Sequence, residues 1–175
     1  QQAPLYELIE QNEGLIKVSA GLAKKIGVRS ISFEGSSLTF NDYSKLAKEL
    51  HPIKPGISVS LDELRVIKER EEIACIEKAC DIGDDAFEDI ITYIKPGMTE
   101  IEVAARLENT MRCLGSEKVS FTTIVASGKR GSLPHGIATD KLIFEGEFVT
   151  MDYGAVYRGY HSDVTRTVCI GTVDG

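Results

Sequence analysis

Apolar and polar residues alternate along 148–170, near the end of the printed sequence. The segment is rich in Val, Thr, Tyr and Ile, the residues that favour strands, and Arg158-Gly159 lies at its midpoint. This pattern predicts a β-hairpin with a two-residue turn, in which Tyr157 lies opposite Tyr160.

The hairpin register places two acidic residues on one face. With a two-residue turn, Asp152 lies opposite Thr165, and Asp163 lies opposite Gly154. Side chains alternate faces along a strand, so the two carboxylates share a face as diagonal neighbours, about 7–8 Å apart at Cα. Two carboxylates this close repel each other unless a cation lies between them, and a divalent metal or a pair of metals fits that need. A three-residue loop or a bulge would send the acids to opposite faces, and a solvated edge hairpin is the plainer alternative.

Two further polar residues are candidates for chemistry in this region. The Thr165 hydroxyl is placed to hydrogen-bond the Asp152 carboxylate and to orient it. His135 lies in a loop between a proline and a glycine, where an imidazole can donate to a substrate carbonyl and stabilise developing charge. The plainer explanations are a good strand residue at Thr165 and an exposed bystander at His135.

Phe121 and His161 are candidates for a substrate pocket. Phe121 precedes the loop of His135 and offers an apolar wall, although aromatic residues on strands are usually core. His161 lies two residues before Asp163, hence on the same face of the hairpin, although a strand histidine more often covers a neighbouring side chain.

The first part of the chain, residues 1–61, has the pattern of an α/β unit. Apolar residues at helical spacing end at Gly27, and a capping box of Thr39 and Asp42 opens a second helix. We expect strands at 5–10, 30–33 and 57–61, and helices at 15–26 and 39–50. This order is typical of a small α/β unit whose beginning is missing from the sequence.

The second part, residues 62–175, predicts an α+β arrangement. A long amphipathic helix is expected at 62–94, and a capping box of Thr99 and Glu102 opens another that runs to residue 114. A strand at 119–126 and the hairpin follow, so two helices would pack on an antiparallel sheet.

Composition excludes several classes of protein. The net charge of −7 and the pI near 5.1 argue against a nucleic-acid-binding protein, which needs clustered Lys and Arg. No apolar run approaches the length of a membrane span. The four cysteines lack the spacing of a metal site and predict free thiols in a reducing cytoplasm: Cys75, Cys80, Cys113 and Cys169.

Two runs of the sequence resemble a known family: SFTTIVASGKRGSLPHG and GEFVTMDYGAVYRGYHSDVTRTV. A D-x-G strand at Asp152 is followed eleven residues later by the Asp of S-D-x-T-R-T, and His135 stands seventeen residues before Asp152. This pattern resembles the pita-bread metallopeptidases, in particular the branch of aminopeptidase P and Xaa-Pro dipeptidase (prolidase). The resemblance covers nearly the whole chain. It implies that 62–175 is the first half of a pita-bread domain and that 1–61 is the later part of a creatinase-like N-terminal domain.

The resemblance also implies a reaction and its residues. Asp152 and Asp163 would be two of five ligands to a pair of divalent ions, with manganese favoured over cobalt or zinc. His135 would bind substrate and stabilise the tetrahedral intermediate. The implied reaction is metal-assisted hydrolysis of a peptide with proline in second position, by an enzyme whose relatives are often homodimers.

The remaining ligands of the family, a His and two Glu from the second half of the domain, have no match in this chain. We therefore expect an internal fragment without peptidase activity of its own. Two alternatives remain. Methionine aminopeptidase shares the two aspartates but lacks the preceding domain, and metal-free pita-bread binding modules have lost these acids.

Overall fold

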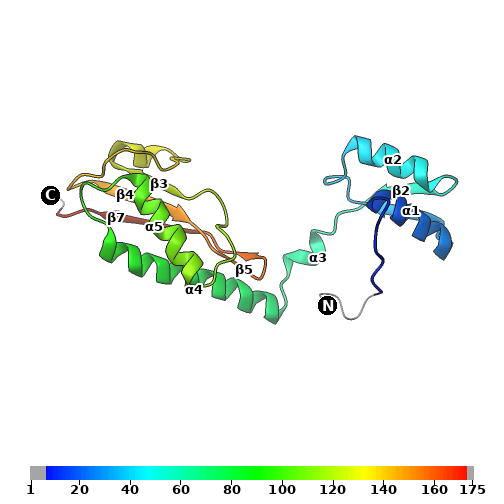
Figure 1. The fold of residues 1–175 in the computed structure, drawn as a ribbon, viewed down its shortest axis with the longest axis horizontal. Coiled ribbons are helices and arrows are strands. Elements are labelled where there is room, and N and C mark those ends of the chain that lie inside the picture. Colours follow the sequence, from blue (N-terminus) through cyan, green and yellow to red (C-terminus); the bar gives the residue numbers. More distant parts are fainter. Residues whose placement is uncertain (1–6, 173–175) are drawn as a thin grey trace. The chain divides into compact units, whose positions relative to one another are not determined.

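Two separate hydrophobic cores divide the chain. The computed structural model describes residues 7–172 and forms two compact units, Gln1–Ile67 (unit 1) and Lys68–Gly175 (unit 2) (Figure 1). Unit 1 buries a small cluster that includes Leu46 and Leu50, and unit 2 buries a larger one around its sheet. Each unit is described here by itself. No helix of the described residues is long and apolar enough to cross a membrane.

Unit 1 is a small α/β arrangement. Its elements are α1 (Leu15–Ile26), β1 (Ser30–Phe33), α2 (Phe40–Leu50), β2 (Lys54–Ser58) and the short α3 (Glu63–Val66). β1 and β2 are parallel neighbours, joined through α2. Gly27 ends α1 in the left-handed conformation at φ 77°, and the Thr39 side chain accepts a hydrogen bond from the Asp42 N–H at the start of α2, as the sequence predicted.

Two strand predictions in unit 1 need correction. The strand expected at 57–61 is β2, which begins earlier, at Lys54, and ends at Ser58. Its start includes Pro55, because β2 has a single partner strand and a proline is tolerated on such an edge. Of the strand expected at 5–10, residues 7–10 form no strand, and the rest lies outside the described residues.

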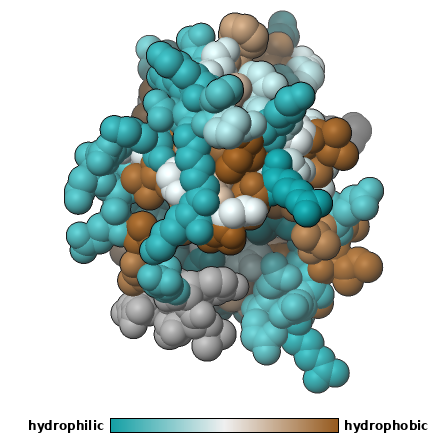
Figure 2. Space-filling model, turned by 90° about the vertical axis from the view of Figure 1, so that its right-hand side faces the viewer, coloured by the Kyte–Doolittle hydropathy of each residue, from teal (hydrophilic) through white to brown (hydrophobic). Residues whose placement is uncertain are grey.

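The surface of unit 1 is mixed in character. In the view of Figure 2, hydrophobic side chains are scattered among hydrophilic ones. Several large apolar side chains of unit 1 are more than half exposed: Leu15, Ile26, Phe40 and Ile57.

The helix expected at 62–94 consists of two helices. A short α3 (Glu63–Val66) is separated by Ile67, in extended conformation, from the long α4 (Arg70–Tyr93). A capping box between Glu69 and Glu72 starts α4. Glutamate is an unusual residue at the helix N-cap, so the sequence pattern favoured Asp62 instead.

Unit 2 is an antiparallel sheet covered on one face by helices. The sheet has the order β3 (Ile124–Ser127), β4 (Phe148–Tyr153) and β7 (Val164–Cys169), and α4 and α5 (Glu100–Cys113) pack on it (Figure 1). Every second residue of β4 is buried in the core with α4 and α5: Val149, Met151 and Tyr153. The alternate residues of β4, among them Asp152, therefore face away from the helices. This is the predicted α+β arrangement.

The hairpin has the predicted register. Its tip is formed by β5 (Val156–Tyr157) and β6 (Tyr160–His161), with Tyr157 opposite Tyr160. Arg158 and Gly159 have φ of 49° and 79°, the signature of a two-residue type I′ turn. The same register continues into β4 and β7, where Asp152 pairs with Thr165.

Candidate metal and substrate site

A hollow of about 440 Å³ lies on the open side of the β3–β4 pair. Its lining comes from the segment before β3, β3 itself, the loop that follows η1 (Gly128–Ser132), β4, and the residue before β7. The lining residues are Phe121, Thr122, Ile124, His135, Ile137, Asp152 and Asp163. The structure therefore brings together four of the six residues that the sequence singled out.

Asp152 is held from both neighbouring strands. It lies between Ile124 of β3 and Thr165 of β7 and is half-buried. The Thr165 hydroxyl donates a hydrogen bond of 2.7 Å to Oδ1 of Asp152. One carboxylate oxygen of Asp152 thus accepts a hydrogen bond from the neighbouring strand. This bond orients the Asp152 side chain.

Asp163 lines the same hollow without a protein partner. Its side chain is exposed and makes no hydrogen bond or ion pair within residues 7–172. No Lys or Arg lines the hollow, and the nearby Arg166 instead binds Asp84 on α4, at 3.1 Å. Two carboxylates without a Lys or Arg beside them are a donor set that a hard divalent cation prefers, so these residues fit a metal ion.

His135 enters the hollow from the loop between η1 and β4. Its side chain is exposed, and its carbonyl accepts a hydrogen bond of 2.9 Å from the Ile137 N–H. Ile137 forms an isolated antiparallel bridge with Ile124, so the loop lies against β3. An imidazole and an apolar wall therefore face the two carboxylates.

His161 and Thr165 do not line the hollow. His161 shares a hydrogen bond of 2.9 Å between its Nδ1 and the Ser120 hydroxyl. Thr165 acts only through Asp152. The roles assigned to all six residues stay predictions.

Among the described residues, Asp152 and Asp163 are the two carboxylates that line the hollow. Between residues 7 and 172, no three His, Cys, Asp or Glu side chains converge in a way that could hold a metal ion. Any further ligands to a cation in the hollow must come from elsewhere.

The structure gives a reason for Gly154, and it shows a buried residue, Glu100, that sequence reasoning missed. A Cβ at Gly154 would meet the Ser162 carbonyl and lie 2.9 Å from Cβ of Ser120. The glycine is therefore required by the close approach of two backbones. Glu100 is fully buried and accepts hydrogen bonds from Ser127 and Thr139, the residues on either side of segment 128–138, which carries His135. A Glu in the first turn of a helix is usually solvated, so no sequence signal marked it.

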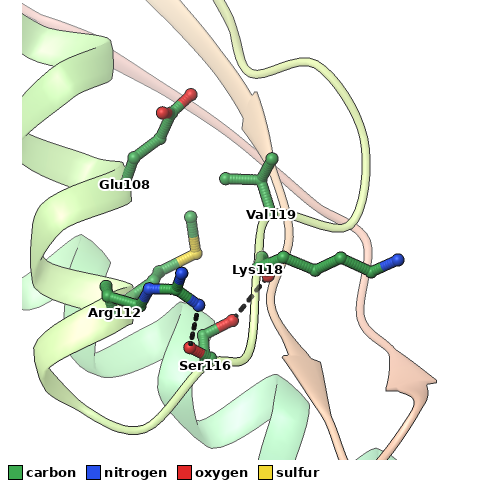
Figure 3. A pocket seen from close by; sticks show the side chains of 6 residues that line it. Glu108, Arg112, Ser116, Lys118 and Val119 are labelled. Atoms are coloured by element: carbon green, nitrogen blue, oxygen red, sulfur yellow. Dashed lines mark hydrogen bonds between the residues drawn. The ribbon is translucent and has the colours of Figure 1, made fainter.

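A second hollow, of about 250 Å³, lies at the end of α5 (Figure 3). Arg112 donates to the Ser116 carbonyl there, and the Ser116 hydroxyl donates to the carbonyl of Lys118. The lining has Glu108 as its only acid and no histidine, so it lacks the paired carboxylates of the first hollow.

The antiparallel sheet, its two covering helices and the acids on its open side define the class of the protein. This is the first half of a pita-bread domain, preceded by an α/β unit. The chain belongs to metallopeptidase family M24, whose model matches residues 74–175.

Relatives and solved structures agree with this assignment. The chain is 46% identical over 167 residues to the uncharacterized peptidase YqhT of Bacillus subtilis, covering 95% of this chain and 47% of that protein. It is 44% identical over 148 residues to the Xaa-Pro dipeptidase of Pyrococcus horikoshii, covering 83% and 42%. The structure of the Xaa-Pro dipeptidase from Bacillus anthracis superposes with a TM-score of 0.92 at 41% identity, covering 99% and 49%. The chain thus spans about half the length of the relatives it matches.

Proposed function

We propose that the full-length protein hydrolyses the peptide bond before a proline in the second position of its substrate. The observation that carries this proposal is that Asp152, Asp163 and His135 line a single hollow whose lining includes no Lys or Arg. The names of the relatives, Xaa-Pro dipeptidase among them, support the same substrate class.

Asp152 and Asp163 would hold two divalent metal ions, manganese in our proposal, together with ligands from outside this chain. When bound, such ions polarise the scissile carbonyl and supply a nucleophile at neutral pH. Thr165 occupies Oδ1 of Asp152, which would leave the other carboxylate oxygen to bind a cation.

His135 and the apolar wall would bind the substrate. The imidazole of His135 is in the hollow, where it can donate to the carbonyl oxygen as negative charge develops. The proline ring has no N–H to recognise, so the site must accept it by shape, and Phe121 and Ile137 offer apolar surface for it. His161 would border this pocket through its contact with Ser120.

The remaining properties follow from the same proposal. Two carboxylates do not fill two metal sites, so the 175-residue chain is expected to be inactive alone. Its cysteines are free, in agreement with a reducing cytoplasm. We propose a homodimer, with no nucleic-acid or membrane partner.

The test uses the full-length protein with Mn²⁺ and two dipeptides that differ only in Pro or Ala at the second position. We expect turnover of the Xaa-Pro dipeptide and little of the Xaa-Ala dipeptide. Calorimetric titration with Mn²⁺ gives a second readout, in which Asp152→Asn and Asp163→Asn lose metal affinity. Asp85→Asn, an exposed acid on α4, is the matched control and should keep it.

Each failure of this test has a distinct meaning. Equal turnover of both dipeptides, or preference for a peptide that begins with Met, would overturn the proline specificity. Wild-type Mn²⁺ affinity in both aspartate variants would overturn the metal site and favour a binding module. Robust turnover by the 175-residue chain alone would refute its expected inactivity.

A further inference from the structure

Glu100, the first residue of α5, is a carboxylate with no solvent exposure. It accepts hydrogen bonds from three residues. Ser127 donates through its backbone N–H (2.8 Å) and its hydroxyl (3.0 Å), and Thr139 donates through the same two groups (3.1 and 2.7 Å). Nε of Arg130 lies 3.2 and 3.1 Å from the two carboxylate oxygens. Every acceptor position of this buried group is therefore used.

These donors enclose one segment, residues 128–138, which we name the His135 loop. Ser127 ends β3 just before the loop, and Thr139 follows its last residue, so one carboxylate joins its two ends. Arg130 lies within the loop and also donates to the Ile137 carbonyl at 2.7 Å. Glu100 thus holds the two ends of the loop together. Arg130, its ion-pair partner, also hydrogen-bonds Ile137, two residues after His135.

The charges of this network balance. The Ser127 hydroxyl accepts from Nζ of Lys141 at 2.8 Å, and the same ammonium pairs with Glu147 at 2.8 Å. With Arg130 against Glu100, two cations face two carboxylates. Burial raises the pKa of Glu100, but the hydrogen bonds from Thr139 and Ser127 lower it more, so its pKa lies below the ordinary value and the group stays ionised at neutral pH.

The loop also packs tightly on β3. A Cβ added at Gly136 would lie 2.8 Å from Cβ of Ala126, so the loop backbone touches the strand next to His135. A connecting segment of this length is ordinarily mobile unless its ends and middle are fixed. Here the ends are fixed by Glu100 and the middle by the strand.

We propose that Glu100 is a positioning residue: it holds the His135 loop so that the imidazole faces Asp152 and Asp163 in the common hollow. This inference rests on the proposed function. Within residues 7–172, Glu100 makes no hydrogen bond to a residue that lines the hollow, and in this proposal it acts through Ser127, Arg130 and Thr139.

The test compares Glu100→Gln with Glu102→Gln in the full-length protein. Glutamine keeps the volume at position 100 but turns an acceptor into an N–H donor that faces other donors. We expect a fall of about 10- to 100-fold in kcat/KM with unchanged metal content, as for other groups that orient a site from behind. Glu102 is a matched control, because its carboxylate accepts hydrogen bonds from Thr99 at the start of the same helix, but it is exposed and makes no hydrogen bond to the described loop residues.

A double-mutant cycle separates positioning from general damage to the fold. In a His135→Ala background, Glu100→Gln should cost less than about 3-fold further, because its effect passes through His135. In a Thr165→Val background, Glu100→Gln should lower kcat/KM by the full 10- to 100-fold. Equal losses in the two backgrounds, or no loss at all, would overturn the proposal.

Hydrogen exchange judges the loop without reference to activity. Amides of 128–138 should exchange faster in Glu100→Gln, while those of α4 keep their protection. Unchanged protection of the loop would overturn the proposal. If Glu100→Gln does not fold, Thr139→Val removes a single donor, and the same loop-specific loss of protection and the same coupling with His135 are expected. If the wild-type protein does not turn over Xaa-Pro peptides, the proposed function is contradicted. The exchange experiment would still show whether Glu100 holds the His135 loop.

Discussion

The hydroxyl of Thr165 donates a hydrogen bond of 2.7 Å to Oδ1 of Asp152, across the β4–β7 pair. The contact exists because the two residues are direct partners in the hairpin register, which the two-residue turn fixes. The turn at the tip of the hairpin therefore sets the strand register, and that register orients Asp152, a proposed metal ligand.

Thr165→Val should weaken metal binding without unfolding the protein. Valine has the same shape but no hydroxyl, so the Asp152 carboxylate loses the group that fixes its rotamer. We expect Mn²⁺ affinity to fall by about 10- to 100-fold, measured by calorimetric titration. Thr167→Val is the matched control, because its hydroxyl bonds Thr150 on the same two strands, 3.1 Å away. A loss of affinity as large in the control would show that any hydroxyl on this face matters.

Mn²⁺ should stabilise the full-length protein through both aspartates. A ligand bound only to the folded state adds about 2.7 kcal/mol at one hundred times its Kd. We expect the thermal unfolding midpoint to rise with Mn²⁺ in the wild type and to change little in Asp152→Asn or Asp163→Asn. Without metal, the variants should be at least as stable as the wild type, because one of two neighbouring negative charges is gone. A full Mn²⁺ response in either variant would contradict the assignment of that residue.

Gly154→Ala should be strongly destabilising. Its Cβ would run into the Ser162 carbonyl and lie 2.9 Å from Cβ of Ser120, and backbone cannot move aside cheaply. We expect a loss of about 3 kcal/mol or more in the free energy of unfolding, measured with urea. Gly131→Ala, whose added Cβ has only contacts of 3.7 Å, should change it by less than about 0.5 kcal/mol. Equal stability of the two variants would mean that β4 and the hairpin adjust freely.

The stabilising contribution of Glu100 should disappear in acid. Hydrogen bonds from Thr139 and Ser127 outweigh the effect of burial and hold its folded pKa below the ordinary value of 4.5. A lowered folded pKa gives stability that is present above the unfolded pKa and lost as pH falls through the folded one. The difference in unfolding free energy between wild type and Glu100→Gln should therefore be largest near neutral pH and shrink below about pH 4.5. A difference that stays constant down to about pH 3 would contradict this linkage.

Local sequence patterns predicted the elements that carry the site. The alternation in 148–170 and the turn at Arg158-Gly159 gave the correct register, because side chains in a strand alternate with period two. The pair of Thr99 and Glu102 correctly marked the start of α5, since a capping box is a contact within four residues.

Element boundaries were less predictable where residues that are uncommon at such positions form them. The start of α4 at Arg70 depends on a Glu69–Glu72 capping box that few helices use, and β2 includes Pro55 because it pairs on one side alone. The residues concerned are visible in the sequence, but helix-capping and strand preferences favoured a helix start at residue 62 and a strand start at residue 57.

The sequence by itself predicted the hairpin register that places Asp152 and Asp163 on one face, and the family motif marked His135. Only the tertiary structure decided that His135, Phe121 and Ile137 meet those acids in one hollow, and that Glu100 binds both ends of the loop in between. Strand alternation is a local property of the backbone, whereas these contacts join residues that are tens of positions apart, and they form only when helices and sheet pack on a common core.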